Sequence, residues 1–361
     1  MWKVWKGENH VKIKLILTGG TIGSKVEEEN SLADVTRDSV YLLVKAYEEK
    51  YGKDTDFDIE LVLQSLSENF SPDTWEKLCK SLNDIDTAKY DGIVLAHGTD
   101  TLSYTSSLLS ILFAENEIPI VCIASNYPIG MKKSNGLDNF RSAVIFIKET
   151  RNLNMRGVYT IFQNRKKENV LYAANQLMES DAQLDEFSSF GNEILGKIEI
   201  VPSEKVELYQ EKVHNYAEFQ KKCVQVQRTK EISKDIQFKH KIQIIYSYPG
   251  MDYSLFEIAY CRQKEGKKPK AVLLVLYHSA TACVEGAEYS ALSIIRTCRE
   301  QGIDFYMTSF KRDAETTYVT TQKLLDAGAI PLYEMSVELS YVKLCCAYNQ
   351  NRIEPKAFMD A

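Results

Sequence analysis

The sequence predicts an α/β fold in two parts: a larger N-terminal, mostly parallel sheet flanked by helices, and a smaller C-terminal α/β domain. Its 361 residues are enough for two domains, because a single domain usually has about 100–200 residues. Short apolar runs alternate with helical patterns along the first two-thirds of the chain, and the alternation resumes after a charge-rich stretch. Strands that alternate with crossover helices form mostly parallel sheets covered on both faces.

The N-terminal part contains four predicted strands. Apolar, β-branched runs that end in glycine or polar residues predict these strands at 12–20, 57–67, 90–96 and 118–125. Helical patterns between and after them predict helices at 36–52, 71–85, 105–114 and 139–150. Gly52 ends the first of these helices and Pro72 lies in the first turn of the second, which are the positions that each residue favours.

A charge-rich stretch separates the two predicted domains. Residues 202–240 lack strong strand signals and predict a partly helical linker between an N-terminal domain at 1–201 and a C-terminal domain at 241–361. The C-terminal strands are predicted at 241–250, 271–279, 303–310 and 330–336, separated by helices such as 290–302.

The charge balance and hydropathy exclude several classes of protein. A net charge of −6 argues against binding to nucleic acid, which needs a basic surface. Charged residues interrupt every apolar run near the N-terminus, so we expect no signal peptide. No run approaches the roughly 20 apolar residues that span a membrane. These features predict a cytoplasmic protein without membrane contact.

The cysteines and histidines indicate neither a disulfide framework nor a metal site. The eight cysteines form no C-x-x-C pair, and the five histidines do not pair with cysteine or acidic residues at metal-ligand spacing. We therefore expect reduced cysteines and no metal or cofactor.

Polar residues follow each of the four predicted N-terminal strands, in the stretches "TGGTIGS", "SLSENFSP", "HGTDT" and "ASNYPIG". Parallel sheets bind ligands at the carboxyl ends of their strands. Thr21 and Thr99 offer hydroxyl nucleophiles, Asp100 offers a carboxylate for an ammonium group, and Ser67 with backbone N–H groups could hold a carboxylate. This set predicts a pocket for a small zwitterion. The alternative is that the threonines and Asp100 only cap a helix.

Two motifs in this order resemble the signature regions of the bacterial-type L-asparaginase family, and the resemblance is strongest to the cytoplasmic type I branch. They are "TGGTIG" and, about seventy residues later, "DGIVLAHGTDTLSYTSSLLS". The similarity continues through "SENFSPDTW", "PIVCIASNYP" and "IQIIYSYPGMD", and covers most of the chain except the linker. It implies an asparaginase-like fold and hydrolysis of the side-chain amide of asparagine, or of a related small amide, to carboxylate and ammonia. It also implies a homodimer or homotetramer.

The resemblance assigns catalytic roles to Thr21, Thr99 and Asp100, and a substrate-binding role to Ser67. Thr21 would be the primary nucleophile and Thr99 the second catalytic threonine. Asp100 would bind the α-amino group of the substrate, and Ser67 its α-carboxylate. Backbone N–H groups would form the oxyanion hole during attack on the carboxamide, and water would then hydrolyse the acyl-enzyme.

The resemblance also assigns further substrate-binding positions. Gly20 and Gly98 belong to the two signature turns, and Glu68 stands where many relatives have Gln or Ser. Ser125 lies where a backbone carbonyl meets the side-chain amide of the substrate. His97 is expected to support its turn through a hydrogen bond.

Two activating groups of the family are missing from their expected positions. The loop at 23–36 contains no tyrosine, and Met178 or Glu179 stands where the family has a lysine. Lys132, Lys133 or another tyrosine could replace them. A non-catalytic amino-acid-binding homologue is therefore an alternative to the enzyme. A weaker alternative follows from "LSENFSP", which is similar to the asparaginase-like subunit of archaeal glutamyl-tRNA amidotransferases. That subunit has an additional N-terminal domain, which we do not expect in this chain.

Overall fold

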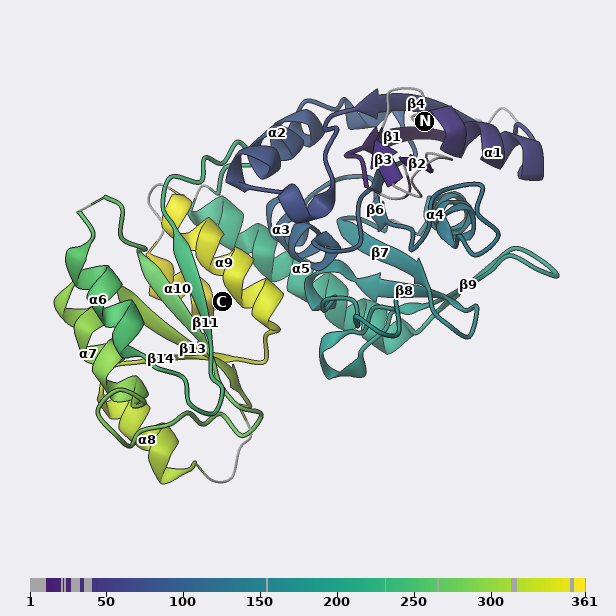
Figure 1. Ribbon diagram of the computed structural model, residues 1–361. Helices are drawn as coiled ribbons and strands as arrows, with labels where there is room; N and C mark the ends of the chain where they lie inside the picture. The colour runs from purple at the N-terminus through teal and green to yellow at the C-terminus, as the bar shows by residue number, and fades with distance from the viewer. Residues whose placement is uncertain are drawn as a thin grey trace. The chain divides into compact units, whose positions relative to one another are not determined.

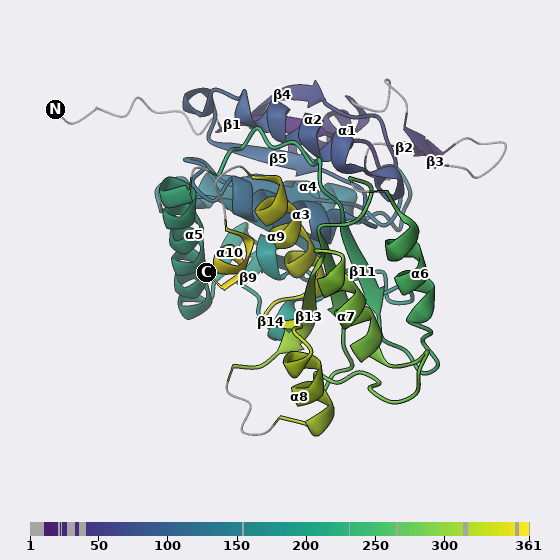
Figure 2. The same cartoon turned by 90° about the vertical axis from the view of Figure 1, so that its left-hand side faces the viewer.

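The chain divides into two compact units, Met1–Gln225 and Val226–Ala361, in a computed structural model. The structure describes residues 11–20, 22, 24–26, 33–35, 41–153, 155–230, 232–264, 266–312, 317–350 and 354–360. Figure 1 shows both units with their elements labelled, and Figure 2 shows them after a turn of 90°.

The first unit is built on an eight-stranded sheet of order β10-β9-β8-β7-β6-β5-β1-β4. Its strands are β1 (Val11–Leu17), β4 (Thr55–Leu61), β5 (Gly92–Ala96), β6 (Ile120–Ile123), β7 (Val158–Gln163), β8 (Asn169–Ala173), β9 (Gly196–Glu199) and β10 (Lys205–Leu208). Neighbouring strands from β4 to β7 are parallel, and those from β7 to β10 are antiparallel. A short hairpin, β2 (Ser24–Val26) and β3 (Ala33–Val35), forms its own antiparallel pair. The predicted, mostly parallel N-terminal sheet is confirmed.

Helices cover both faces of this sheet. They are α1 (Leu42–Tyr51), α2 (Pro72–Asn83), α3 (Leu102–Leu112), α4 (Gly136–Thr150) and α5 (Gln210–Lys230). Buried side chains of α1, α4 and α5 share one core cluster with alternate residues of β1, β5, β6 and β7. On α2 and α3, Trp75 donates its indole N–H to Thr105 at 3.0 Å, and Ser106 bonds Thr160 of β7 at 3.1 Å. Both faces are thus buried at the centre of the sheet, which explains why β5 and β6 are apolar throughout.

The antiparallel half of the sheet contains strands that we did not predict from the sequence. We predicted no strands between 150 and 201, yet β7 to β9 lie there. The residues of β7 and β8 are buried on both faces, and such runs lack the alternation that identifies a strand. Strand β9 has only four residues. The range predicted as a linker, 202–240, includes β10 and α5, and Figure 2 shows α5 as a long helix.

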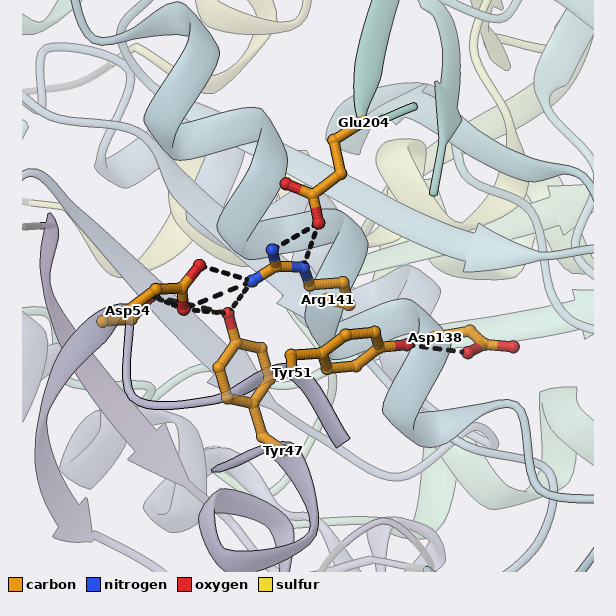
Figure 3. Close-up of polar contacts among 7 residues, drawn as sticks. Tyr47, Tyr51, Asp54, Asp138, Arg141 and Glu204 are labelled. Carbon is orange, nitrogen blue, oxygen red and sulfur yellow. Dashed lines mark hydrogen bonds and ion pairs between the residues drawn. The ribbon is translucent and has the colours of Figure 1, made fainter. Parts of the chain in front are cut away.

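Arg141 of α4 connects the chain segments that enter the two outermost strands of the sheet. Its guanidinium donates to Glu204, just before β10, at 2.6 Å from Nε, and to Asp54, just before β4, at 3.0 Å. Figure 3 shows the two carboxylates approaching Arg141 from opposite sides. Tyr47 also accepts a hydrogen bond from Arg141, and the Tyr51 ring lies 4.9 Å from the guanidinium. Arg141 therefore ties the segments before both edge strands of the sheet to α4.

The second unit contains a four-stranded parallel sheet of order β11-β12-β13-β14. Its strands are β11 (Ile242–Tyr246), β12 (Ala271–Val275), β13 (Asp304–Phe310) and β14 (Ile330–Tyr333). Its helices are α6 (Ser254–Arg262), α7 (Ala291–Glu300), α8 (Val319–Asp326), α9 (Val337–Asn349) and α10 (Pro355–Asp360). Helices α6, α7 and α8 lie on one side of the sheet, and α9 and α10 on the other (Figure 1). The predicted smaller α/β unit with four strands is confirmed.

Candidate active site

Three turns at the carboxyl ends of the first unit's strands approach one another very closely. A Cβ added to Gly20 would lie 2.6 Å from the Gly98 Cα, and one added to Gly98 would lie 2.4 Å from the Ser67 Oγ. A Cβ added to Gly19 would lie 2.4 Å from the carbonyl oxygen of Ser65. Only glycine fits at such distances, and Gly20 also has φ of +76°, which L side chains rarely adopt. The structure therefore brings together Gly20, Ser67 and Gly98.

Hydrogen bonds hold these turns in register. The Thr18 N–H donates to the Ala96 carbonyl at 3.1 Å, and the Ser65 N–H donates to the Thr18 carbonyl at 3.3 Å. The Thr101 hydroxyl donates to the Ser67 carbonyl at 3.0 Å. Main-chain bonds and the hydroxyls of Thr18 and Thr101 thus join the ends of β1, β4 and β5.

The polar side chains of Thr99 and Asp100 have no bonding partner in the described part of the chain. Thr99 is half-buried and Asp100 is exposed, and neither side chain makes a hydrogen bond or ion pair with a described residue. The residue at the N-cap of α3 is Thr101, without a side-chain cap, because its hydroxyl bonds Ser67 instead. The capping alternative for Thr99 and Asp100 therefore receives no support, and no described residue engages either side chain.

The other predicted site residues differ in their surroundings. Ser67 is buried at 2% exposure, at the start of the 3₁₀ helix Ser67–Asn69, whereas the Glu68 side chain is exposed. Ser125 follows β6, beside β5, and its buried hydroxyl donates to the Tyr127 carbonyl at 2.6 Å. That hydroxyl is therefore engaged in its own loop, and only the main chain of Ser125 remains to bind a substrate.

Thr21 and most of the loop predicted to lack an activating tyrosine lie outside the described residues. Met178 and Glu179, one of which the resemblance places where the family has a lysine, follow β8; Met178 is half-buried and Glu179 is exposed. In the described ranges, no group of three or more His, Cys, Asp or Glu residues is placed to hold a metal ion, and the described cysteines are free. No helix among the described elements is both long and apolar enough to cross a membrane.

His97 supports the third turn from inside the protein. It is fully buried, its Nδ1 lies 2.8 Å from the Gly98 carbonyl, and its ring packs against Phe70 with centroids 4.6 Å apart. Because a carbonyl only accepts, Nδ1 carries the proton, and Nε2 is left without a described hydrogen-bond partner. Burial lowers the pKa of His97 to about 4, so the ring is neutral near pH 7.

This burial predicts a loss of stability in acid. In the unfolded chain His97 is protonated below about pH 6.5, whereas in the folded protein it stays neutral down to about pH 4. The free energy of unfolding therefore falls as the pH decreases through this window. The expected loss is about 3 kcal/mol. In His97→Asn, whose amide can replace the Nδ1 donor, this part of the loss should disappear. Urea unfolding of both proteins between pH 7 and 4 measures the difference, and parallel pH profiles would contradict the assignment.

Comparisons with known proteins match this architecture. A family model described as "Asparaginase, N-terminal" matches residues 12–214. A glutamyl-tRNA(Gln) amidotransferase subunit of Saccharolobus solfataricus is 27% identical over 350 residues, which cover 92% of this chain and 70% of that protein. The same subunit of the Sulfolobus acidocaldarius amidotransferase is 25% identical over 346 residues, with the same coverage of each chain.

Solved structures share the fold at lower identity. The thermostable L-asparaginase of Thermococcus kodakarensis superposes with a TM-score of 0.71 at 21% identity, over 97% of each chain. L-asparaginase I of Vibrio cholerae superposes with a TM-score of 0.69 at 22% identity, over 97% of this chain and 96% of that one. The matched model covers more than half of the sequence and includes the three joined turns, so this chain belongs to the asparaginase family.

Proposed function

We propose that this protein hydrolyses the side-chain amide of asparagine, or of a related small amide, to a carboxylate and ammonia. The observation that carries the proposal is the junction of Gly20, Ser67 and Gly98, with the Thr99 hydroxyl and the Asp100 carboxylate beside it and unused by the described residues. A small zwitterion needs such a set: a carboxylate for its ammonium group, a hydroxyl for its carboxylate and free hydroxyls near its amide.

In the proposed reaction, the Thr21 hydroxyl attacks the carboxamide carbon and its proton passes to the departing nitrogen, which leaves as ammonia. Backbone N–H groups of the joined turns would stabilise the negative oxygen of the intermediate. Water then hydrolyses the acyl-enzyme and restores the hydroxyl. Thr99 would be the second catalytic threonine, Ser67 would bind the α-carboxylate and Asp100 the α-amino group. Glu68 and the main chain of Ser125 would complete the substrate pocket.

Relatives named as amidotransferase subunits support a second candidate function. Their name describes amide transfer on glutamyl-tRNA(Gln), and they match 92% of this chain. Release of ammonia from an amide would also be the first step in such a role. Under either function we expect a cytoplasmic homodimer or homotetramer without a cofactor. A non-catalytic amino-acid-binding protein remains the alternative if no group activates the threonines.

Ammonia release from L-Asn, L-Gln, D-Asn and other small amides tests the proposal. We expect turnover that falls by about 10²–10⁴-fold in Thr99→Ala and further in Thr21→Ala. Asp100→Ala should raise the KM for amides that carry an α-amino group. Asp84→Ala removes an exposed carboxylate at the end of α2 and serves as the matched control. Preference for L-Gln over L-Asn would favour the amidotransferase role.

Calorimetry with L-Asp and L-Asn separates the enzyme from the binding protein. Binding that Asp100→Ala abolishes, without turnover of any amide, would replace hydrolysis with amino-acid binding. Turnover that survives both threonine substitutions would contradict the assigned nucleophiles.

A further inference from the structure

A polar pocket lies at the carboxyl end of the first unit's sheet, beyond β6 and β7. Its volume is about 330 Å³, at the lower end of the range of about 300–1,000 Å³ for small-molecule sites. The loop after β6, the turn between β7 and β8, and the segment 183–185 form its walls. The prediction from sequence missed it because it placed no strand at 158–163, so the turn that follows β7 was not recognised.

The lining of this pocket is cationic in an acidic protein. Lys133, Arg165 and Lys167 supply three positive charges, and Asp185 supplies a single negative one. The chain as a whole has a net charge of −6. Apart from these and Leu184, the lining residues are asparagines and glutamines. Since most ligand pockets are mainly apolar, this lining suits a ligand that is itself charged and strongly hydrated.

The three cations are available to an anion. None of them lies within 4.0 Å of a carboxylate among the described residues. Lys167 donates to the Gln163 side chain at 3.2 Å. The Asp181 carboxylate interacts electrostatically with Arg165, and the Arg165 backbone N–H donates to the Glu186 carboxylate at 2.8 Å. Those two carboxylates do not line the pocket, so the charge inside it remains positive.

Short hydrogen bonds hold the walls in place without a ligand. The Asn126 amide donates to the Asp185 carbonyl at 2.7 Å, and the Asn126 N–H donates to the Asn135 side chain at 3.0 Å. The Asn164 side chain accepts from the N–H groups of Lys166 and Glu168, each at 3.0 Å. The Asn126–Asp185 bond joins two of the walls, and the Asn135 amide joins the third by donating to the Gln163 carbonyl at 3.4 Å. A ligand would therefore meet a site whose backbone is already ordered.

We propose that this pocket binds a phosphate group carried by a small organic or nucleotide unit. A phosphate monoester has a charge of about −1.5 to −2 and three strong acceptor oxygens, which matches the excess of two positive charges better than one carboxylate does. Arg165 can engage two of those oxygens at once. The volume is more than a bare phosphate needs. The lining includes none of the residues proposed to bind the amide substrate, so this proposal does not rest on the proposed hydrolysis.

Two double variants of equal charge provide the test. Lys133→Gln with Arg165→Gln removes two lining cations, and Lys132→Gln with Lys166→Gln removes their sequence neighbours, which do not line the pocket. All four side chains are exposed, so both variants should fold, and thermal unfolding checks this. Binding of inorganic phosphate and ribose 5-phosphate is measured by ³¹P NMR titration, and binding of unfractionated tRNA by filter retention, at low salt.

We expect saturable binding that weakens at least tenfold in the first variant and stays within twofold in the second. Binding of ribose 5-phosphate in this pattern identifies a free phosphate ester as the source of the group. If only tRNA binds in this pattern, the source of the phosphate group is the backbone of RNA. Equal weakening in both variants would show that binding depends only on the overall charge, which would overturn the proposal. If none of the probes binds, the proposal is also overturned.

Discussion

Replacing Gly20 with alanine is expected to lower amide turnover at least about 100-fold, the usual result of a misplacement of about 1 Å. The new Cβ would lie 2.6 Å from the Gly98 Cα and 2.7 Å from its nitrogen. Both atoms belong to the main chain and cannot rotate away, so the first and third turns must separate. This separation would displace Thr99 and Asp100, which follow Gly98 directly.

The same substitution should also destabilise the first unit. Steric overpacking costs about 1–3 kcal/mol, and a side chain at φ of +76° adds about 1–3 kcal/mol of backbone strain. Gly52→Ala is the matched control, because Gly52 has φ of +84° but no atom within 4 Å of the added Cβ. In Gly52→Ala, urea unfolding should show only the destabilisation that backbone strain causes, and ammonia release should show normal turnover. If the two variants behave alike, the close approach of the turns is not what the site requires.

Replacing Arg141 with methionine is expected to cost about 3 kcal/mol of stability, the lower end of the range of about 3–5 kcal/mol for breaking a buried ion pair. Arg141 is 7% exposed, whereas its partners Asp54 and Glu204 are 33% and 30% exposed, so water can partly solvate the carboxylates that remain. Burial acts to raise the pKa of Asp54, but the hydrogen bond and the charge of Arg141 outweigh it and lower that pKa. The ion pair is therefore present at neutral pH and is lost in acid.

Lys12→Met is the control for this prediction. Lys12 pairs with Asp56 at 3.9 Å, and both side chains are about half exposed, so its loss should cost only about 0–1 kcal/mol. Arg141→Lys should remain destabilised, because an ammonium group cannot reproduce the fork that donates to both carboxylates. Equilibrium unfolding in urea measures all three. Equal midpoints for Arg141→Met and Lys12→Met would show that the two ends of the sheet do not need this connection.

The strand ends of the first unit are the part of the site that the sequence predicts well. The end of β1, from Leu15 to Leu17, and all of β5 are apolar because both of their faces are buried, and the change to polar residues marks the carboxyl edge of the sheet. Local rules suffice there, since a strand end and a glycine turn are properties of adjacent residues.

The antiparallel strands β7 to β10 and the cationic pocket show where such rules fail. Their pairing depends on contacts between residues far apart in the sequence, such as β10 with β9 and Asn126 with Asp185. Nothing in the sequence near Lys133 indicates that Arg165 lies across the same pocket.

The sequence by itself determined the two α/β units, the polar ends of the parallel strands and the family, because these depend on local composition and on motifs read in order. Only the tertiary structure decided that Gly20, Ser67 and Gly98 touch. It also decided that Thr101, and not Thr99 or Asp100, is the N-cap residue of α3. The same holds for Arg141, which joins the segments before β4 and β10. Each of these depends on distances of a few ångströms between segments separated by 31 to 87 residues, and such distances are set by packing.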